Sequence, residues 1–201
     1  MIEIPADIPA ELVPLSWLVG VWEGTGVIDY TVGDTHYSGE FTHRVSFSHD
    51  GGSFLNYSAT GVMRATAFQA ERPLVSETGF WRLAVPADDT TPGPGLLPPL
   101  RAATERTAED VERLRTADGS FPIEVVLSHS DGVQELYLGQ AKGPRIDLAT
   151  DAVVRTATSQ PYVAASRMYG LVDGHLLWAW DIAALGRELG SHASARLEKV
   201  S

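Results

Sequence analysis

The feature that most constrains the fold is a series of short β-branched and aromatic segments separated by glycine, proline, aspartate and asparagine, which recurs along the whole chain. Several connections are tight, among them Ser130-Asp131-Gly132 and Val172-Asp173-Gly174, where Asp-Gly supplies the positive φ that a hairpin turn needs. The expected strands are residues 20–30, 39–49, 53–62, 75–83, 123–129, 133–140, 144–153, 162–172, 175–184 and 192–200. Strands joined by short turns pair antiparallel, and closing such a sheet removes its exposed edges. The sequence therefore predicts an all-β fold, a ten-stranded antiparallel up-and-down β-barrel.

Two segments interrupt the strand pattern. Residues 5–18 mix proline with leucine and tryptophan, which indicates a short helical turn ahead of the first strand. Residues 84–122 form an inserted loop whose first half is too rich in proline for a sheet ladder. Its second half begins with a capping residue and early acids, which predicts a short helix over residues 107–115. Few apolar residues could anchor this helix, so we expect it to lie loosely on the surface.

A loop of this length is either a functional lid or a disordered segment. We expect residues 1–201 to form a single domain that includes the insertion.

Composition narrows the kinds of partner. The net charge of −11, with only 15 lysines and arginines, argues against nucleic acid as a partner. An anionic ligand would need a region of the surface that departs locally from this negative charge. No apolar run approaches the ~18–20 residues that span a membrane, and the N-terminus lacks the pattern of a secretory signal. Without cysteine there are no disulfides and no thiolate ligands. We expect a cytoplasmic protein with a small-molecule ligand and no membrane partner; the oligomeric state stays open, with a homodimer as one candidate.

The histidines are the main candidates for metal ligation. None of the six is paired at the spacing of a zinc-binding helix. Four are expected to be solvated or hydrogen-bonded: His43, His49, His129 and His175. His192 begins the last strand, and strict alternation places it on the face opposite Ala193 and Leu197. A β-bulge at this point would turn it inward.

Other catalytic arrangements have less support. There is no Gly-x-Ser-x-Gly segment, and the sequence alone cannot pair the carboxylates of Glu77, Asp147, Asp151 and Asp181. The first strand contains several glycines but lacks the following helix and the lysine of a phosphate-binding loop. We expect these glycines to permit a bend or bulge, with Trp22 packed nearby.

Gly20-Val21-Trp22-Glu23-Gly24-Thr25-Gly26 has the form G-x-W-x-G-x-G and resembles the motif of the nitrobindin family. Residues 76–83, 123–137 and 146–201 continue the resemblance in the same order, so that it covers most of the chain. Members of this family are small ten-stranded barrels similar to fatty-acid-binding proteins, which agrees with the strand pattern.

The resemblance also implies a cofactor and an activity. It implies one ferric haem b per subunit, with His192 as the axial ligand and catalytic residue, and Thr31 as a second cofactor-binding residue. Such proteins isomerise peroxynitrite to nitrate and bind nitric oxide, so the chain would be a haem-dependent isomerase. The alternative is a non-enzymatic carrier that holds a small lipophilic ligand, such as a fatty acid, in the barrel without haem.

Overall fold

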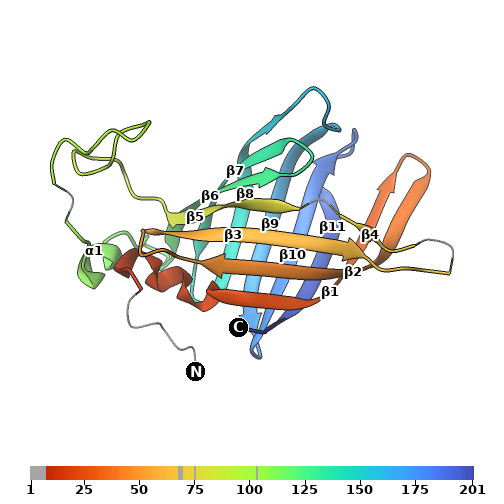
Figure 1. Ribbon diagram of the computed structural model, residues 1–201, viewed down its shortest axis with the longest axis horizontal. Coiled ribbons are helices and arrows are strands. Elements are labelled where there is room, and N and C mark those ends of the chain that lie inside the picture. The colour runs from red at the N-terminus through yellow and green to blue at the C-terminus, as the bar shows by residue number, and fades with distance from the viewer. Residues whose placement is uncertain (1–7, 68–69, 75, 103) are drawn as a thin grey trace.

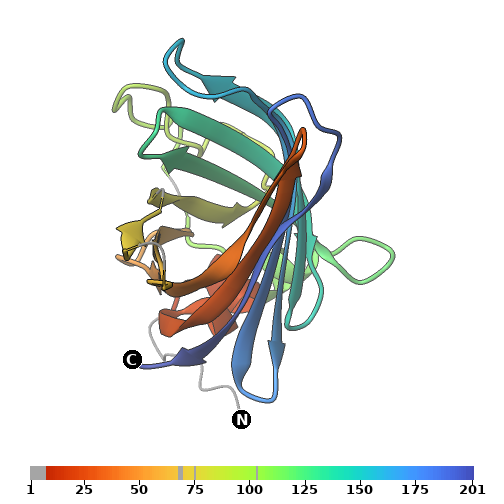
Figure 2. The ribbon, with the colours of Figure 1, turned by 90° about the vertical axis from the view of Figure 1, so that its right-hand side faces the viewer.

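The computed structural model describes residues 8–67, 70–74, 76–102 and 104–201. The strands are β1 (Gly20–Val32), β2 (Thr35–Ser48), β3 (Phe54–Met63), β4 (Arg72–Pro73), β5 (Glu77–Leu83), β6 (Phe121–His129), β7 (Val133–Ala141), β8 (Arg145–Arg155), β9 (Tyr162–Val172), β10 (His175–Ala184) and β11 (Gly190–Lys199). Except for β4 and β5, strands that are neighbours along the chain pair antiparallel; β5 pairs with β3, and β1 pairs with both β2 and β11. These pairings close a barrel of ten strands, to which the short β4 is added beside β3 (Figures 1 and 2). The predicted up-and-down barrel is confirmed.

The hairpin turns follow the local sequence. β9 and β10 are joined by Asp173 and Gly174, whose φ values of 50° and 76° are both positive, as a two-residue hairpin loop of the primed type requires. The first hairpin is longer than expected, because β1 and β2 continue to a two-residue turn at Gly33 and Asp34. Its tip extends beyond the other strands at one end of the barrel (Figure 1). The expected start of a strand at residue 75 lies outside the described residues.

The glycines of β1 allow close contact with the neighbouring backbone. A Cβ atom added at Gly24 would lie 2.2 Å from the carbonyl oxygen of Arg196, and one added at Gly26 would lie 2.5 Å from that of Ser194. β1 pairs with β2 and β11 without a register shift, so the expected bulge in this strand is wrong. These positions are glycines because β1 and β11 lie too close together to leave room for a side chain.

A 3₁₀ helix, η1 (Ala10–Leu18), lies at the end of the barrel away from the β1–β2 hairpin (Figure 1). Its side chains Leu12, Leu15 and Leu18 are fully buried in the core. Trp22 in β1 donates a hydrogen bond from Nε1 to the Leu18 carbonyl at 2.7 Å, which ties η1 to the barrel. The helical turn expected before the first strand is thus present from residue 10, and residues 5–7 lie outside the description. No helix in the described part of the chain is long and apolar enough to cross a membrane.

The insertion contains the short helix α1 (Ala108–Glu112), next to η1 (Figure 1). Thr107 caps it, accepting a hydrogen bond from the Asp110 backbone while the Asp110 carboxylate accepts one from the Thr107 backbone. The expectation of a loosely attached helix is wrong, because Val111 is only 3% exposed and belongs to the core. The insertion therefore lies at the closed end of the barrel, so it is not a lid over the hairpin end.

Candidate functional site

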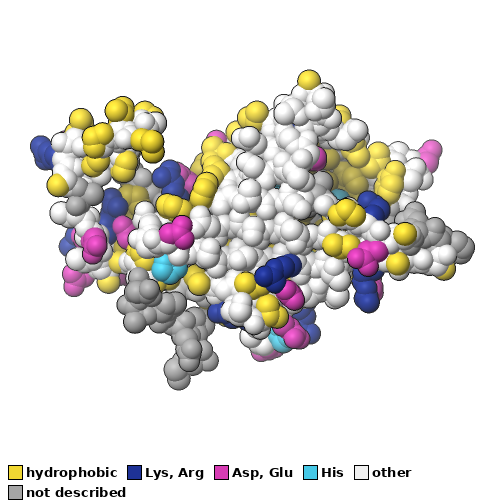
Figure 3. All heavy atoms as spheres, viewed as in Figure 1, with side chains coloured by type: hydrophobic (Ala, Val, Ile, Leu, Met, Phe, Trp, Pro, Cys, Tyr) yellow, Lys and Arg dark blue, Asp and Glu magenta, His cyan; other side chains and the backbone are white. Residues whose placement is uncertain are grey.

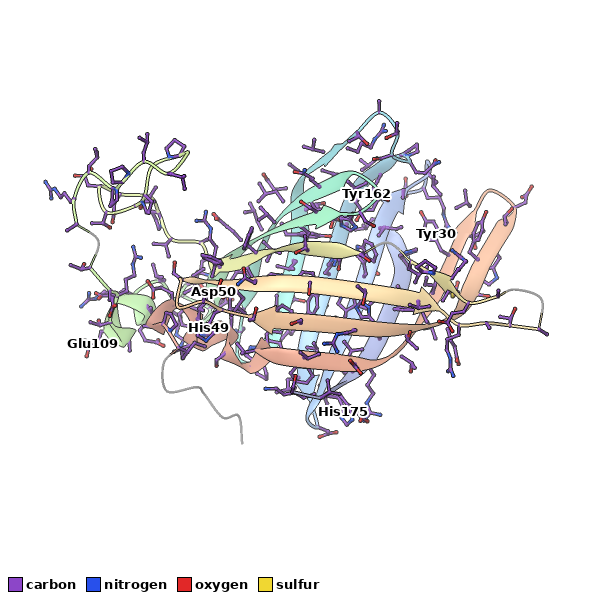
Figure 4. All side chains as sticks on the ribbon, in the orientation of Figure 1. Tyr30, His49, Asp50, Glu109, Tyr162 and His175 are labelled. Atoms are coloured by element: carbon purple, nitrogen blue, oxygen red, sulfur yellow. The ribbon has the colours of Figure 1, made fainter. Side chains whose placement is uncertain are left out.

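Two hollows lie at the barrel end near the β1–β2 hairpin. The inner cavity has a volume of about 260 Å³ and the outer cleft about 850 Å³. Figure 3 shows a recess lined by hydrophobic side chains at this end, and Figure 4 labels Tyr30 from the outer cleft and Tyr162 from the inner cavity there. The two hollows share five lining residues: Ile28, Ile182, Ala184, Leu185 and His192. His192 therefore lies where they meet.

A β-bulge turns His192 inward. In the pairing of β10 with β11, Trp180 faces Ala193 and Asp181 faces Ser191, so His192 is an extra residue in β11 without a partner. The extra residue interrupts the alternation, and both His192 and Ala193 line the inner cavity. The β-bulge that would turn His192 inward is thus present at this residue.

The His192 ring lies between two aromatic side chains and lacks polar partners. It meets Tyr30 and Trp180 edge-on, with ring centroids 5.0 and 5.2 Å away. Nδ1 is buried, and neither ring nitrogen has a hydrogen-bond partner among the described residues. Burial, and to a smaller extent the charge of Arg167, lowers the pKa of His192 to about 4. A neutral imidazole without partners is the form that ligates a metal, so the residue fits the role of an axial haem ligand.

Thr31 lies apart from this site. Its neighbours in β1, Tyr30 and Val32, line the outer cleft, but Thr31 lines neither hollow. Its carbonyl accepts a hydrogen bond from the side chain of Arg187. Alternation along β1 therefore places the Thr31 side chain away from a cofactor in either hollow. The motif residues Gly20, Trp22, Gly24 and Gly26 also line neither hollow and act through packing.

A buried ion-pair cluster adjoins the inner cavity. Arg167 in β9 donates to both carboxylate oxygens of Glu77 in β5, at 2.7 and 2.8 Å, and to Glu135 in β7 at 3.1 Å. The three side chains are at most 8% exposed. Burial alone would raise the pKa of Glu77, but Arg167 offsets it and the pKa is lowered to about 2. Sequence reasoning missed this pair because its members are 90 residues apart.

Glu135 holds the His129 ring in place. The Glu135 carboxylate accepts hydrogen bonds from Tyr137, from Tyr162 and from Nε2 of His129, the last at 2.7 Å. Nε2 of His129 also lies 3.5 Å from the Glu77 carboxylate, and its Nδ1 has no partner among the described residues. Ligand atoms of Glu77, His129 and Glu135 lie within 4.8 Å of one another, but Arg167 already neutralises part of their charge. The cluster therefore resembles an ion-pair network more than a metal site.

His43 is a second buried histidine on the wall of the inner cavity. Its Nδ1 lies 3.1 Å from the Thr60 carbonyl, so this nitrogen donates and Nε2 is an acceptor, buried without a partner. Burial lowers the pKa of His43, which keeps the ring neutral. His43 and His129 are hydrogen-bonded, as expected, but both are also buried at the cavity wall, which depends on strand pairing, whereas His49 lies at the other end of the barrel (Figure 4).

The two hollows differ in charge. The described residues that line the inner cavity include the carboxylates Glu77 and Asp131 but no lysine or arginine. Those that line the outer cleft include Arg64 and Arg72 but no carboxylate. Arg64 forms an ion pair with Glu40 at 3.0 Å, and Arg72 has no ion-pair partner among the described residues. The outer cleft is thus a positively charged region on a protein whose net charge is negative.

Comparisons with known proteins identify the family of this chain. The model of the THAP4-like, heme-binding beta-barrel domain family matches residues 11–199. Among curated relatives, a protein named peroxynitrite isomerase from Leifsonia xyli subsp. xyli is 58% identical over the full length of both chains. Another of that name from Clavibacter michiganensis subsp. michiganensis is 56% identical, again over both full lengths.

A solved structure has a similar fold. The crystal structure of Rv2717c from M. tuberculosis superposes with a TM-score of 0.66 at 25% identity, covering 96% of this chain and 99% of that one. The motifs, the barrel and the inward histidine all agree with the family match. The chain belongs to the family of THAP4-like, heme-binding β-barrel domains, the nitrobindin family.

Proposed function

We propose that this protein is a peroxynitrite isomerase that holds one ferric haem b through His192. The observation that carries the proposal is the bulge in β11, which directs an unpaired, neutral imidazole to the junction of two hollows. The names of the full-length relatives support the choice of reaction. A cytoplasmic location and reversible binding of nitric oxide are part of the same proposal.

The outer cleft suits the porphyrin better than the inner cavity does. Its volume is about 850 Å³ against about 260 Å³, and pockets for drug-sized ligands have roughly 300–1,000 Å³. Haem carries two propionates, and the cleft offers the guanidinium groups of Arg64 and Arg72 on its wall. Tyr30 and Met63 supply apolar surface for the ring.

The residues around His192 hold its imidazole ring in place and keep the ring unprotonated. When bound, ferric haem supplies an open iron position that acts as a Lewis acid during the rearrangement of peroxynitrite to nitrate. The edges of Tyr30 and Trp180 fix the orientation of the imidazole ring. Nδ1 of the ring is buried without a partner, and the cations of the outer cleft attract the anionic substrate.

The test is haem binding by the His192→Ala variant. We expect the wild-type protein, titrated with hemin, to give a Soret band and to accelerate peroxynitrite decay to nitrate. His192→Ala should lose the wild-type spectrum and at least tenfold in hemin affinity. His175→Ala is the matched control, because His175 lies in β10 outside both hollows. A variant spectrum identical to that of the wild type would refute the assignment of His192.

The inner cavity does not suit the head group of a fatty acid, the example given for the carrier alternative. A buried carboxylate needs a cation or several hydrogen-bond donors. Arg167 belongs to the cluster that adjoins the inner cavity, and Glu77 and Glu135 already bind it. The inner cavity therefore offers no free guanidinium from the described residues to a fatty-acid head group.

A further inference from the structure

We propose that the inner cavity is a second binding site, separate from the haem, for a small organic cation with N–H donors on a flat, one-ring frame. The proposal depends on the walls of the inner cavity and does not require haem. It rests on three observations: the size of the cavity, its hydrogen-bond acceptors and its charge.

The size suits one aromatic ring with a short substituent. A cavity of about 150 Å³ lined by apolar side chains is large enough to bind benzene, and this one has about 260 Å³. Phe41, Trp178 and Trp180 provide aromatic wall, with ring centroids of Phe41 and Trp178 6.4 Å apart and those of the two tryptophans 6.0 Å apart. Aromatic surface also attracts a cation that loses its water.

The ionisable groups of the wall act mainly as hydrogen-bond acceptors. Nε2 of His43 is an acceptor with a fixed tautomer, because the ring donates its other N–H to the Thr60 carbonyl, and this nitrogen is buried without a partner. Glu77 is a carboxylate that accepts three hydrogen bonds from Tyr57 and Arg167, and its two oxygens have room for a fourth. A ligand with several N–H donors satisfies these atoms, whereas a carboxylate ligand has none to offer.

The charge of the wall favours a cation. Glu77 presents a buried carboxylate to the cavity, where Arg167 of the adjoining cluster also binds it. Asp131 adds a second carboxylate to the lining, and no lysine or arginine is present there among the described residues. In surroundings of low dielectric such an excess charge acts strongly on a nearby ligand.

Three probes of nearly the same shape test this proposal: benzamidine, benzamide and benzoate. At neutral pH they are a cation with donors only, a neutral amide, and an anion with acceptors only. Binding to the wild-type full-length chain, with and without hemin, is measured by calorimetry and by tryptophan fluorescence. We expect benzamidine to bind at least tenfold more tightly than benzoate, with benzamide between them. Equal affinities, tighter benzoate, or no binding of benzamidine would overturn the proposal.

Two variants locate the site. Ala59 lines the inner cavity and not the outer cleft, so Ala59→Leu should fill the cavity and weaken benzamidine at least tenfold while hemin still binds. Ala149→Leu, at an exposed position of β8, is the matched control. Unchanged benzamidine affinity in Ala59→Leu would refute the location.

Glu77→Gln keeps the shape and removes one negative charge, so the preference for benzamidine over benzoate should fall at least threefold. An unchanged preference in a folded variant would contradict the charge argument. If Glu77→Gln does not fold, the three probes and Ala59→Leu still test the proposal. His192→Ala separates this site from the haem site. We expect this variant to lose hemin binding and to keep its preference for benzamidine over benzoate.

Discussion

His192 combines a position at the cavity junction with a ring that resists protonation. Burial, with Arg167 as the lesser cause, lowers its pKa to about 4 from 6.5. Between these values the unfolded chain binds a proton that the folded chain does not, so unfolding becomes easier as the pH falls through this window. The same enclosure that makes the nitrogen available to a metal therefore reduces stability in acid.

This pH dependence can be isolated with one substitution. When the pH is lowered from 7 to 4, the free energy of unfolding should fall in both the haem-free wild type and His192→Leu. The fall should be larger in the wild type by on the order of 2 kcal/mol, after allowance for the partial exposure of the ring. Urea denaturation at a series of pH values measures the difference, and carboxylates common to both proteins cancel. His175→Leu should follow the wild type. Parallel curves for wild type and His192→Leu would contradict the role of burial.

The extra residue in β11 determines which way His192 points. Because side chains alternate along a strand, removing one residue beyond the bulge restores the simple register, in which His192 and Ala193 lie on opposite faces. Trp180 and Ala193 keep their pairing in that register, so the rest of the barrel need not change. The bulge is therefore separable from the fold.

Deletion of Ser191 tests this directly. We expect the shortened chain to fold with a β-sheet spectrum like that of the wild type and to lose at least tenfold in hemin affinity, because His192 then points outward. Ser191→Ala, which keeps the bulge, should bind hemin normally. Circular dichroism and hemin titration measure the two properties. Normal hemin binding by the deletion variant would show that the bulge does not orient the ligand.

Local signals predicted the elements better than the contacts between them. The turn at Asp173 and Gly174 and the cap at Thr107 depend on a few neighbouring residues, and both are where the sequence places them. The outer part of β2 was missed because His36 and Tyr37 are both exposed and show no alternation. The inward turn of His192 depends on its pairing with β10, which the sequence of β11 alone does not contain.

Across the whole barrel, Arg167 connects distant strands. It joins β9 to Glu77 of β5 and Glu135 of β7, and Tyr57 of β3 also donates to Glu77 at 2.6 Å. Such a cluster cannot be predicted from one sequence, because nothing local distinguishes Glu77 from the exposed acids before the strands are assembled. The barrel was predictable from repeated local patterns, whereas this part of the site was not.

Arg167→Met should destabilise the protein by about 3–5 kcal/mol at neutral pH, because two buried carboxylates lose their cation. Paired with Arg167, Glu77 has a pKa of about 2 against 4.5, so its contribution to stability is present above pH 4.5 and is lost towards pH 2. The deficit of the variant should therefore shrink over that range. Thermal unfolding measures it, and Arg145→Met, which removes an exposed pair with Asp147, should have a much smaller effect than Arg167→Met. Equal effects of the two substitutions would contradict the role of the cluster.

The buried leucines of η1 close the end of the barrel away from the hairpin, and the two hollows meet along five residues at the other end. The two hollows therefore share part of their walls, while the lining of the inner cavity also includes the exposed residues Asp131, Gln160 and Pro161. We expect a molecule bound in one hollow to change the rate at which a molecule leaves the other, because both contact the same five side chains.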